Sequence, residues 1–313
     1  MTFLIRFIRT TLVGSWLMIT GITGIYAQGR TDFRLTHKID SLVKGFPGTV
    51  GIYIKNLKSG ETAVFQPDSI FPTCSMIKVP IMITLFNRIE HGALSYQQNM
   101  VYRDSMLIKG VDILGGFKDS ATILLSKLVL LMITESDNTA AVWCQSLAGG
   151  GIAINHWLKS HGFVHTRVNS RTPGRSAAWN LYGWGQTTPR EMARLVTLIR
   201  EGKLVSPAAS ERMYRNLIRI YWDGEALSQI PPYVQVASKQ GAVDDSRSEV
   251  DLVNAPHGDY VFCIITKNLQ DTSWKQDNEG WTLIRRLSGM LYHYYEPQDN
   301  WKPAPGREKW IDQ

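Results

Sequence analysis

The segment Ser75-Met76-Ile77-Lys78, with the apolar run Val-Pro-Ile-Met-Ile-Thr-Leu-Phe that follows it, predicts a buried helix over residues 76–89. Pro80 is compatible with this helix because it lies near the start. Ser75 and Lys78 are three residues apart and therefore share a helical face. A serine becomes nucleophilic when a neighbouring amine accepts its proton, and burial and nearby cations can lower the lysine pKa enough for that. Ser41 and Lys44 have the same spacing but are expected on the polar side of an earlier helix, so spacing alone decides nothing.

Hydrophobic periodicity divides the rest of the chain into parts with different secondary structure. Before Ser75 we expect a helix at 32–44 and a hairpin with strands at 49–54 and 62–65. Between residues 94 and 203 no convincing strand pair is visible, and we expect helices at 120–134, 138–147 and 188–200. The last of these opens with the capping box Thr188-Pro189-Arg190-Glu191. After Pro231 strand patterns return, followed by a final helix, at 233–238, 249–253, 260–266 and 274–294.

This order of elements predicts an α/β (α+β) fold. An antiparallel sheet is flanked by the N- and C-terminal helices and is interrupted by an inserted all-helical domain. Only segments far apart in the sequence can then complete the sheet. We expect a discontinuous α/β domain of residues 28–93 and 206–295, an all-α domain of residues 94–205 and an extended tail of residues 296–313.

Composition narrows the function classes. The chain of 313 residues is 44% hydrophobic and 19% charged, which is typical of a globular protein with a full core. Its net charge of +7 is diffuse, with no block of five like charges, so it favours a small anionic substrate rather than nucleic acid. Arg6 and Arg9 precede an uncharged stretch, which predicts a signal peptide over residues 1–27 that is cleaved near Ala27. We therefore expect an exported, periplasmic protein; the alternative is an uncleaved N-terminal membrane anchor.

The remaining metal and disulfide signals are weak. Three cysteines, Cys74, Cys144 and Cys263, allow at most one disulfide, and the chain has no CxxC pair that would suggest structural zinc. The histidines at 156, 161 and 165 lie in a stretch without carboxylates, so we predict no metal site and no cofactor. The run Gly149-Gly150-Gly151 lacks the lysine of a phosphate-binding loop and is interpreted as a linker.

Two further segments carry chemistry. Ser136-Asp137-Asn138 lies between two predicted helices, and its structural interpretation is a helix N-cap. Lys239-Gln240-Gly241 directly follows a predicted strand; the glycine would let a ligand lie close to the backbone, and the structural interpretation is a turn. Lys58-Ser59-Gly60 has a similar pattern but lies in the predicted hairpin turn before Ser75. Each segment is weak by itself, whereas their order and spacing together are specific.

Taken together, these segments resemble the penicillin-recognising serine enzymes, most closely the class A β-lactamases. The resemblance covers residues 32–294 and includes Thr187-Thr188-Pro189, similar to the segment that closes the family's Ω-loop. It implies a β-lactamase/transpeptidase-like fold and a monomeric serine hydrolase that acts by acyl transfer on a β-lactam or related amide. Antibiotic breakdown and antibiotic resistance would be the corresponding roles.

The resemblance also assigns roles to residues. It implies that Ser75 is the nucleophile, that Lys78 is its proton partner and that Ser136 relays a proton to the leaving nitrogen. Asn138 would hold the substrate amide, and Lys239 with Arg247 would attract a substrate carboxylate. Gly241 belongs to the lysine-glycine strand, and the backbone N–H groups of Ser75 and Ala242 would form the oxyanion hole.

Two departures from the family pattern matter. Gln240 replaces a small hydroxyl residue, which removes one donor to a substrate carboxylate and adds bulk. The stretch from Thr139 to Arg190 contains no Asp or Glu, although the family uses an Ω-loop glutamate to activate the water that clears the acyl-enzyme. The loop at 171–186 offers Asn180, Tyr182 and Gln186 instead, and Glu135 is the nearest carboxylate in sequence, expected at a solvated helix end.

Three functions remain open from the sequence. The first is a β-lactamase-like hydrolase, and the second is a penicillin-binding or sensor-type protein that acylates but turns over slowly. The third is a non-catalytic envelope protein with a decayed site.

Overall fold

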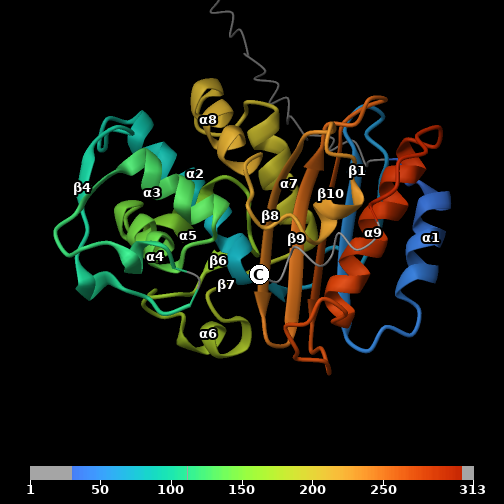
Figure 1. Ribbon diagram of the computed structural model, residues 1–313, viewed down its shortest axis with the longest axis horizontal. Helices are drawn as coiled ribbons and strands as arrows, with labels where there is room; N and C mark the ends of the chain where they lie inside the picture. Colours follow the sequence, from blue (N-terminus) through green and yellow to red (C-terminus); the bar gives the residue numbers. More distant parts are fainter. Residues whose placement is uncertain (1–29, 111, 305–313) are drawn as a thin grey trace, which may run out of the picture.

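The computed structural model describes residues 30–110 and 112–304, and a five-stranded antiparallel sheet lies at its centre (Figure 1). The strand order is β2-β1-β10-β9-β8. These strands are β1 (Thr49–Asn56), β2 (Thr62–Phe65), β8 (Val236–Val243), β9 (Ser246–Val253) and β10 (Tyr260–Lys267). Because β1 pairs with β10 along its whole length, segments from opposite parts of the sequence complete the sheet. The predicted fold class is confirmed.

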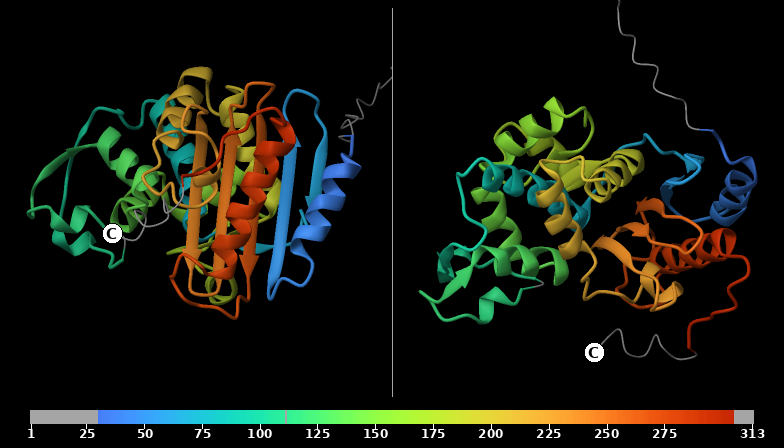
Figure 2. Two further views of the ribbon diagram at one scale, coloured as in Figure 1. Left: turned by 45° about the vertical axis from the view of Figure 1, so that its right-hand side comes forward. Right: turned by 90° about the horizontal axis from the view of Figure 1, so that it is seen from above.

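Two helices, α1 (Phe33–Val43) and α9 (Glu279–Tyr295), lie side by side over one face of the sheet (Figure 2). Asp32 caps α1 by accepting a hydrogen bond from the backbone N–H of Leu35 at 2.9 Å. Leu35 and Ile39, one turn apart, are fully buried and share a core with the apolar face of α9. Burial of such a stripe stabilises each helix by about 1.5–3 kcal/mol for every large apolar side chain.

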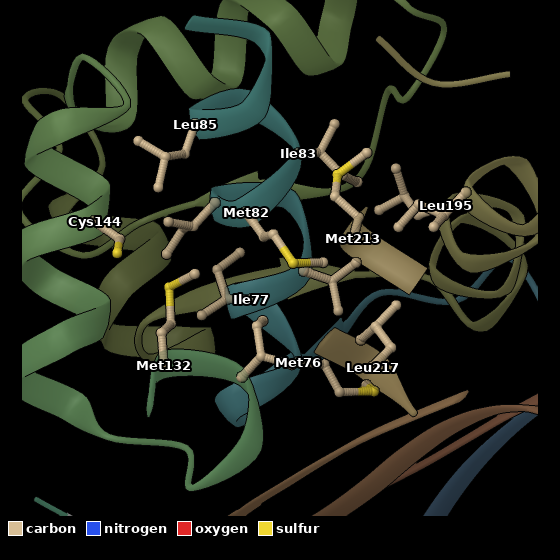
Figure 3. Close-up of a cluster of buried hydrophobic side chains, with 14 of the residues drawn as sticks. Met76, Ile77, Met82, Ile83, Leu85, Met132, Cys144, Leu195, Met213 and Leu217 are labelled. Atoms are coloured by element: carbon tan, nitrogen blue, oxygen red, sulfur yellow. The ribbon is translucent and has the colours of Figure 1, made fainter. Parts of the chain in front are cut away.

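A larger helical layer covers the other face of the sheet and extends beyond its β8 edge (Figure 1). Its helices are α2 (Lys78–Glu90), α3 (Leu125–Thr134), α4 (Asn138–Leu147), α5 (Gly150–Ser160), α7 (Pro189–Arg200) and α8 (Pro207–Leu217). Helix α2 lies in the middle of this layer, with Met82 and Ile83 surrounded by side chains from the neighbouring helices (Figure 3). Because α2 is buried on all sides over its first nine residues, packing fixes the position of the segment that begins with Ser75.

Short strands complete the structure where the sequence predicted none. β4 (Asn99–Val101) pairs with β5 (Thr122–Leu124), and a second small sheet contains β3 (Phe71–Pro72), β7 (Gly185–Thr187) and β6 (Arg167–Val168). The prediction of no strand pair between residues 94 and 203 is therefore wrong, and the helix expected from residue 120 begins at Leu125. Strands of two or three residues are too short to show an alternating pattern.

Other local predictions need correction. The glycine run is not a linker: Gly149, with φ +97°, makes the turn into α5, and the helix begins at Gly150. A further short helix, α6 (Ser176–Tyr182), lies in the predicted long loop. At α7 half of the capping box forms, because Thr188 Oγ1 accepts from the Glu191 N–H at 3.2 Å. The Glu191 carboxylate instead accepts from the backbone N–H groups of Val164 and Thr166, each at 2.7 Å.

The two ends of the chain and the domain boundaries stay predictions. The signal peptide of residues 1–27 lies outside the described residues, as does the tail beyond residue 304. Within the described part, no helix is both long and apolar enough to cross a membrane. The domain boundaries stay a prediction, although α2 and α8, from segments assigned to the α/β domain, share the core of the helical layer. Cys74, Cys144 and Cys263 are all buried and free.

Candidate active site

A cleft of 540 Å³ opens between the start of α2, the edge strand β8 and the segment around α6. Ser75, Asn138 and Ala242, which come from three distant parts of the sequence, all line it. The sheet holds the Ala242 side and the helical layer holds the Asn138 side, so the cleft lies where the two halves of the fold meet. This position agrees with the prediction that distant segments converge on Ser75.

Ser75 lies in a 3₁₀ turn, η1 (Cys74–Ile77), that leads directly into α2. Cys74 has φ +45°, a conformation that few side chains adopt, and the neighbouring core holds this sharp entry in place. Lys78 is the first residue of α2, is fully buried and donates a hydrogen bond to Ser75 Oγ at 3.1 Å. The predicted serine and lysine are therefore in direct contact, with the amine positioned to exchange a proton with the hydroxyl.

Ser136 and Asn138 reach the same amine from the connection between α3 and α4. Lys78 Nζ donates to Ser136 Oγ at 3.0 Å, to Asn138 Oδ1 at 2.9 Å and to the Ser136 carbonyl. Ser136 has φ +63°, so this connection is strained and needs support. Asp137 supplies it: the buried carboxylate caps α4 through the Ala140 N–H at 2.7 Å and also accepts from the N–H groups of Ile113 and Leu114.

Lys239 approaches from the sheet. Its ammonium donates to Ser136 Oγ at 3.1 Å, so this hydroxyl lies between two buried amines. The sequence placed Lys239 just after a strand, but β8 continues to Val243 because every residue from Val236 onward pairs with β9. Lys239 and Gly241 are therefore strand residues, and the regular pairing holds the Lys239 backbone.

Burial lowers the pKa values of both amines, and the positive charge of Lys239 lowers that of Lys78 further. For Lys78 the largest cause is loss of hydration, followed by the positive charge of Lys239, while Asp137 opposes the shift; together they hold the pKa well below its usual value. Burial lowers the pKa of Lys239 to about 7, against the opposing effect of Glu249. A lysine with a strongly lowered pKa is neutral over part of the physiological range and can accept a proton.

Gly241 allows the sheet to approach the nucleophile closely. A Cβ atom at this position would lie 2.6 Å from Ser75 N and 2.8 Å from Cys74 Cβ, closer than atoms in real structures come. The next residue, Ala242, lines the cleft beside Ser75. The backbone of β8 is thus brought against η1, as an oxyanion hole shared by the two segments requires.

The structure does not bring the Arg247 guanidinium to this cleft. Arg247 is fully buried on the opposite face of the sheet, where its guanidinium lies 4.7 Å from the Trp274 ring centre and 5.2 Å from that of Trp281. It donates to the backbone carbonyls of Val243, Asp244, Ser246 and Ser273. The expected role of Arg247 in attracting a substrate carboxylate is not supported, because its guanidinium lies on the other face of the sheet. The order of the segments in the sequence does not show which face of the sheet a strand side chain occupies.

Gln240 occupies the position next to the Lys239 ammonium. Lys239 Nζ donates to the side-chain oxygen of Gln240 at 2.9 Å and to its backbone carbonyl at 2.9 Å. The Gln240 side chain, which is larger than the hydroxyl residue of the family pattern, therefore points toward the Lys239 amine.

The loop over residues 171–186 lines the cleft without a carboxylate. Asn180 and Tyr182 face the cleft, whereas Arg175 bonds Asn169 and, at 2.6 Å, Gln186. Glu135 is not among the cleft-lining residues, and its backbone carbonyl accepts from the Trp222 indole at 2.9 Å. Across the described chain, Asp245 is the carboxylate among the residues that line this cleft.

Some cleft residues were not singled out from the sequence. Lys109 and Lys267 line the rim, and nothing in their local sequence marks them. The anchoring by Asp137 was not foreseen either, although its cap position was recognised. Within residues 30–110 and 112–304, no group of three or more His, Cys, Asp or Glu side chains is arranged to hold a metal ion.

Comparison with known proteins gives a consistent picture. Residues 34–295 match the model of the beta-lactamase enzyme family. Beta-lactamase VEB-1 of Pseudomonas aeruginosa is 23% identical over 87% of this chain and 94% of its own, and a beta-lactamase of Bacteroides uniformis is 23% identical over 86% and 93%. The solved structure of PBP-A is 27% identical, with a TM-score of 0.76, over 86% of this chain and 98% of its own. A mutant of PBP-A, solved as an acyl-enzyme complex with penicillin-G, is 26% identical with the same TM-score and coverage.

Proposed function

Since this chain belongs to the beta-lactamase enzyme family, we propose that it is a serine acyl-transfer hydrolase whose Ser75 is acylated by β-lactams or related amides. The observation that carries this proposal is the contact of Lys78 Nζ with Ser75 Oγ, Ser136 Oγ and Asn138 Oδ1, all within 3.1 Å. These contacts place a nucleophile, a base and a second hydroxyl around one point in a cleft. A purely structural buried lysine would not need a reactive hydroxyl at the cleft surface.

Proton transfer can be followed through these contacts. Neutral Lys78 accepts the Ser75 proton while Ser75 Oγ forms a bond to the substrate carbonyl carbon. The bond from that carbon to nitrogen then breaks, and the nitrogen takes a proton from Ser136, which receives the one held by Lys78. No proton is gained or lost overall, and the product is an ester of Ser75 with a free amine on the leaving side.

The developing oxyanion needs donors at the same point. We assign this role to the backbone N–H groups of Ser75 and Ala242, which the close approach of β8 at Gly241 supports. Each such donor contributes about 3 kcal/mol of transition-state stabilisation in comparable sites.

Hydrolysis of the ester is proposed to be slow. Water must be deprotonated to attack it, and the loop at 171–186 offers amides and a phenol rather than a carboxylate. Asp245, which also lines the cleft, lies on the β8–β9 turn and not on that loop. This protein would therefore accumulate as an acyl-enzyme, in agreement with its similarity to PBP-A, a mutant of which is solved as an acyl-enzyme complex with penicillin-G.

Labelling with a fluorescent penicillin, allowed to proceed to completion, tests the assignment of Ser75. We expect Ser75→Ala to abolish the label. Ser41→Ala is the matched control, because Ser41 also precedes a lysine by three residues but is exposed on α1 and bonds the His37 carbonyl. Undiminished labelling of Ser75→Ala would refute the proposal.

A further inference from the structure

The ammonium of Lys239 has no donor left for a substrate. A protonated lysine has three N–H groups, and here they point to Ser136 Oγ, the Gln240 carbonyl and the Gln240 side-chain oxygen. Two of the three acceptors belong to the neighbouring Gln240. The residue that follows Lys239 in the strand therefore occupies two of the three donors of the ammonium.

The other cations near this point are also engaged. Lys78 donates to acceptors within the site, and the Arg247 guanidinium donates to carbonyls on the far face of the sheet. At the rim, Lys267 bonds the Ile70 carbonyl at 2.9 Å, and the Asp245 carboxylate lines the same cleft. Lys109 is exposed and lines the cleft, and it makes no hydrogen bond with Ser136 or Gln240, the partners of Lys239.

We propose that Gln240, by occupying the Lys239 ammonium, removes the preference for a carboxylate beside the attacked bond, so that substrates with a neutral group there, such as an ester or amide, are acylated as readily as the corresponding acids. A carboxylate could bind Lys239 only by displacing the Gln240 side-chain oxygen from the ammonium. The binding free energy gained would then be only the difference between the new hydrogen bond to the carboxylate and the lost hydrogen bond to Gln240. A neutral group requires no such exchange. The inference rests on the proposed acylation of Ser75 and extends its substrate class to neutral esters and amides.

Benzylpenicillin and its methyl ester provide a matched pair of probes, because they differ only in the charge of the group beside the lactam nitrogen. The second-order rate constant for acylation of the full chain is measured by intact-protein mass spectrometry. For the wild type we expect the two rate constants to agree within about threefold. In Gln240→Thr the acid should react about tenfold faster, the factor that one additional charge-assisted hydrogen bond provides, while the ester is unchanged.

Two further variants make the result interpretable. Gln240→Ala frees the ammonium without adding a hydroxyl and should shift the ratio in the same direction by a smaller factor. Gln97→Thr makes the same replacement at an exposed glutamine outside the cleft and should change neither rate.

The outcomes separate this inference from the proposed function. A wild-type preference for the acid of tenfold or more, or an unchanged ratio in both Gln240 variants, overturns the proposed role of Gln240 while leaving Ser75 as the nucleophile. If neither probe acylates Ser75 in any variant, the proposed function fails, and this inference fails with it.

Discussion

Replacement of Gly241 by alanine tests the geometry that brings the sheet to the nucleophile. The new methyl group would lie 2.6 Å from Ser75 N and 3.0 Å from Ser248 Oγ. Ordinary contact begins near 3.4 Å, so Ser75 or the edge of β8 must move by about 0.8 Å. Since Gly241 lies in a regular strand, the effect is steric and not torsional.

A displacement of this size at a reacting group lowers rates by about 100-fold, and loss of one oxyanion donor has a similar effect. We expect the acylation rate constant of Gly241→Ala to fall by about that factor, with a loss of about 1–3 kcal/mol in the free energy of unfolding. Intact-protein mass spectrometry with benzylpenicillin gives the rate, and urea denaturation gives the stability.

Gly289→Ala is the matched control. Gly289 lies in α9, and a Cβ there would meet Gln229 at an ordinary 3.6 Å. Its acylation rate should be unchanged, and its stability unchanged or higher by up to about 1 kcal/mol because alanine favours the helix. The reasoning is refuted if folded Gly241→Ala acylates within threefold of the wild type.

Three further predictions follow from the buried charges. Lys78→Ala removes the proposed base and should slow acylation by about 10²–10⁴-fold in the mass-spectrometric assay; a rate near the wild type would exclude Lys78 from proton transfer. The acylation rate should rise with pH through the lowered pKa of Lys78, because only neutral Lys78 accepts the Ser75 proton. Lys239→Gln removes a positive charge that lowers this pKa, so the rise should move to higher pH. A shift to lower pH would contradict repulsion by Lys239 as a cause of the lowered Lys78 pKa. Burial raises the pKa of Glu249 to about 8 and that of Asp251 well above its usual value, so the folded state retains protons that the unfolded chain loses above about pH 4. Stability should therefore fall from about pH 4 to 7, and Asp251→Asn should reduce this fall; a urea midpoint that depends on pH as in the wild type would contradict it.

Long elements with a strong pattern could be predicted from the sequence. The helix at Asn138–Leu147 has the predicted bounds, because Asp137 caps it and its apolar face is continuous. Helix α8 was missed, although Ser206 before Pro207 is an N-cap signal that the structure uses: Ser206 Oγ accepts from the Ala209 N–H at 3.1 Å. The short strands β4 and β5 left no such signal, because pairing with a distant segment determines their conformation.

Most members of the candidate site could be predicted from the sequence, whereas the position of the Arg247 guanidinium and the side-chain orientations could not. The spacing of Ser75 and Lys78 and the order of the later segments predict that five side chains lie together, and hydrogen bonds link all five. Sequence could not show that Arg247 turns to the far face of the sheet or that Gln240 bonds its own neighbour. The direction of each of these side chains depends on the tertiary packing around its strand, and the neighbouring residues in the sequence do not determine that packing.

The fate of the ester at Ser75 is the property of this site that most directly separates slow from rapid turnover. An intact-mass time course after addition of benzylpenicillin, with ring-opened product measured in parallel, follows that ester from formation to release. We predict a single adduct on Ser75 that persists long after free antibiotic is removed, with little more than one equivalent of product. Rapid return to the free protein with many equivalents of product would contradict slow hydrolysis, and absence of any adduct and product, or an adduct that remains in Ser75→Ala, would contradict acylation of Ser75.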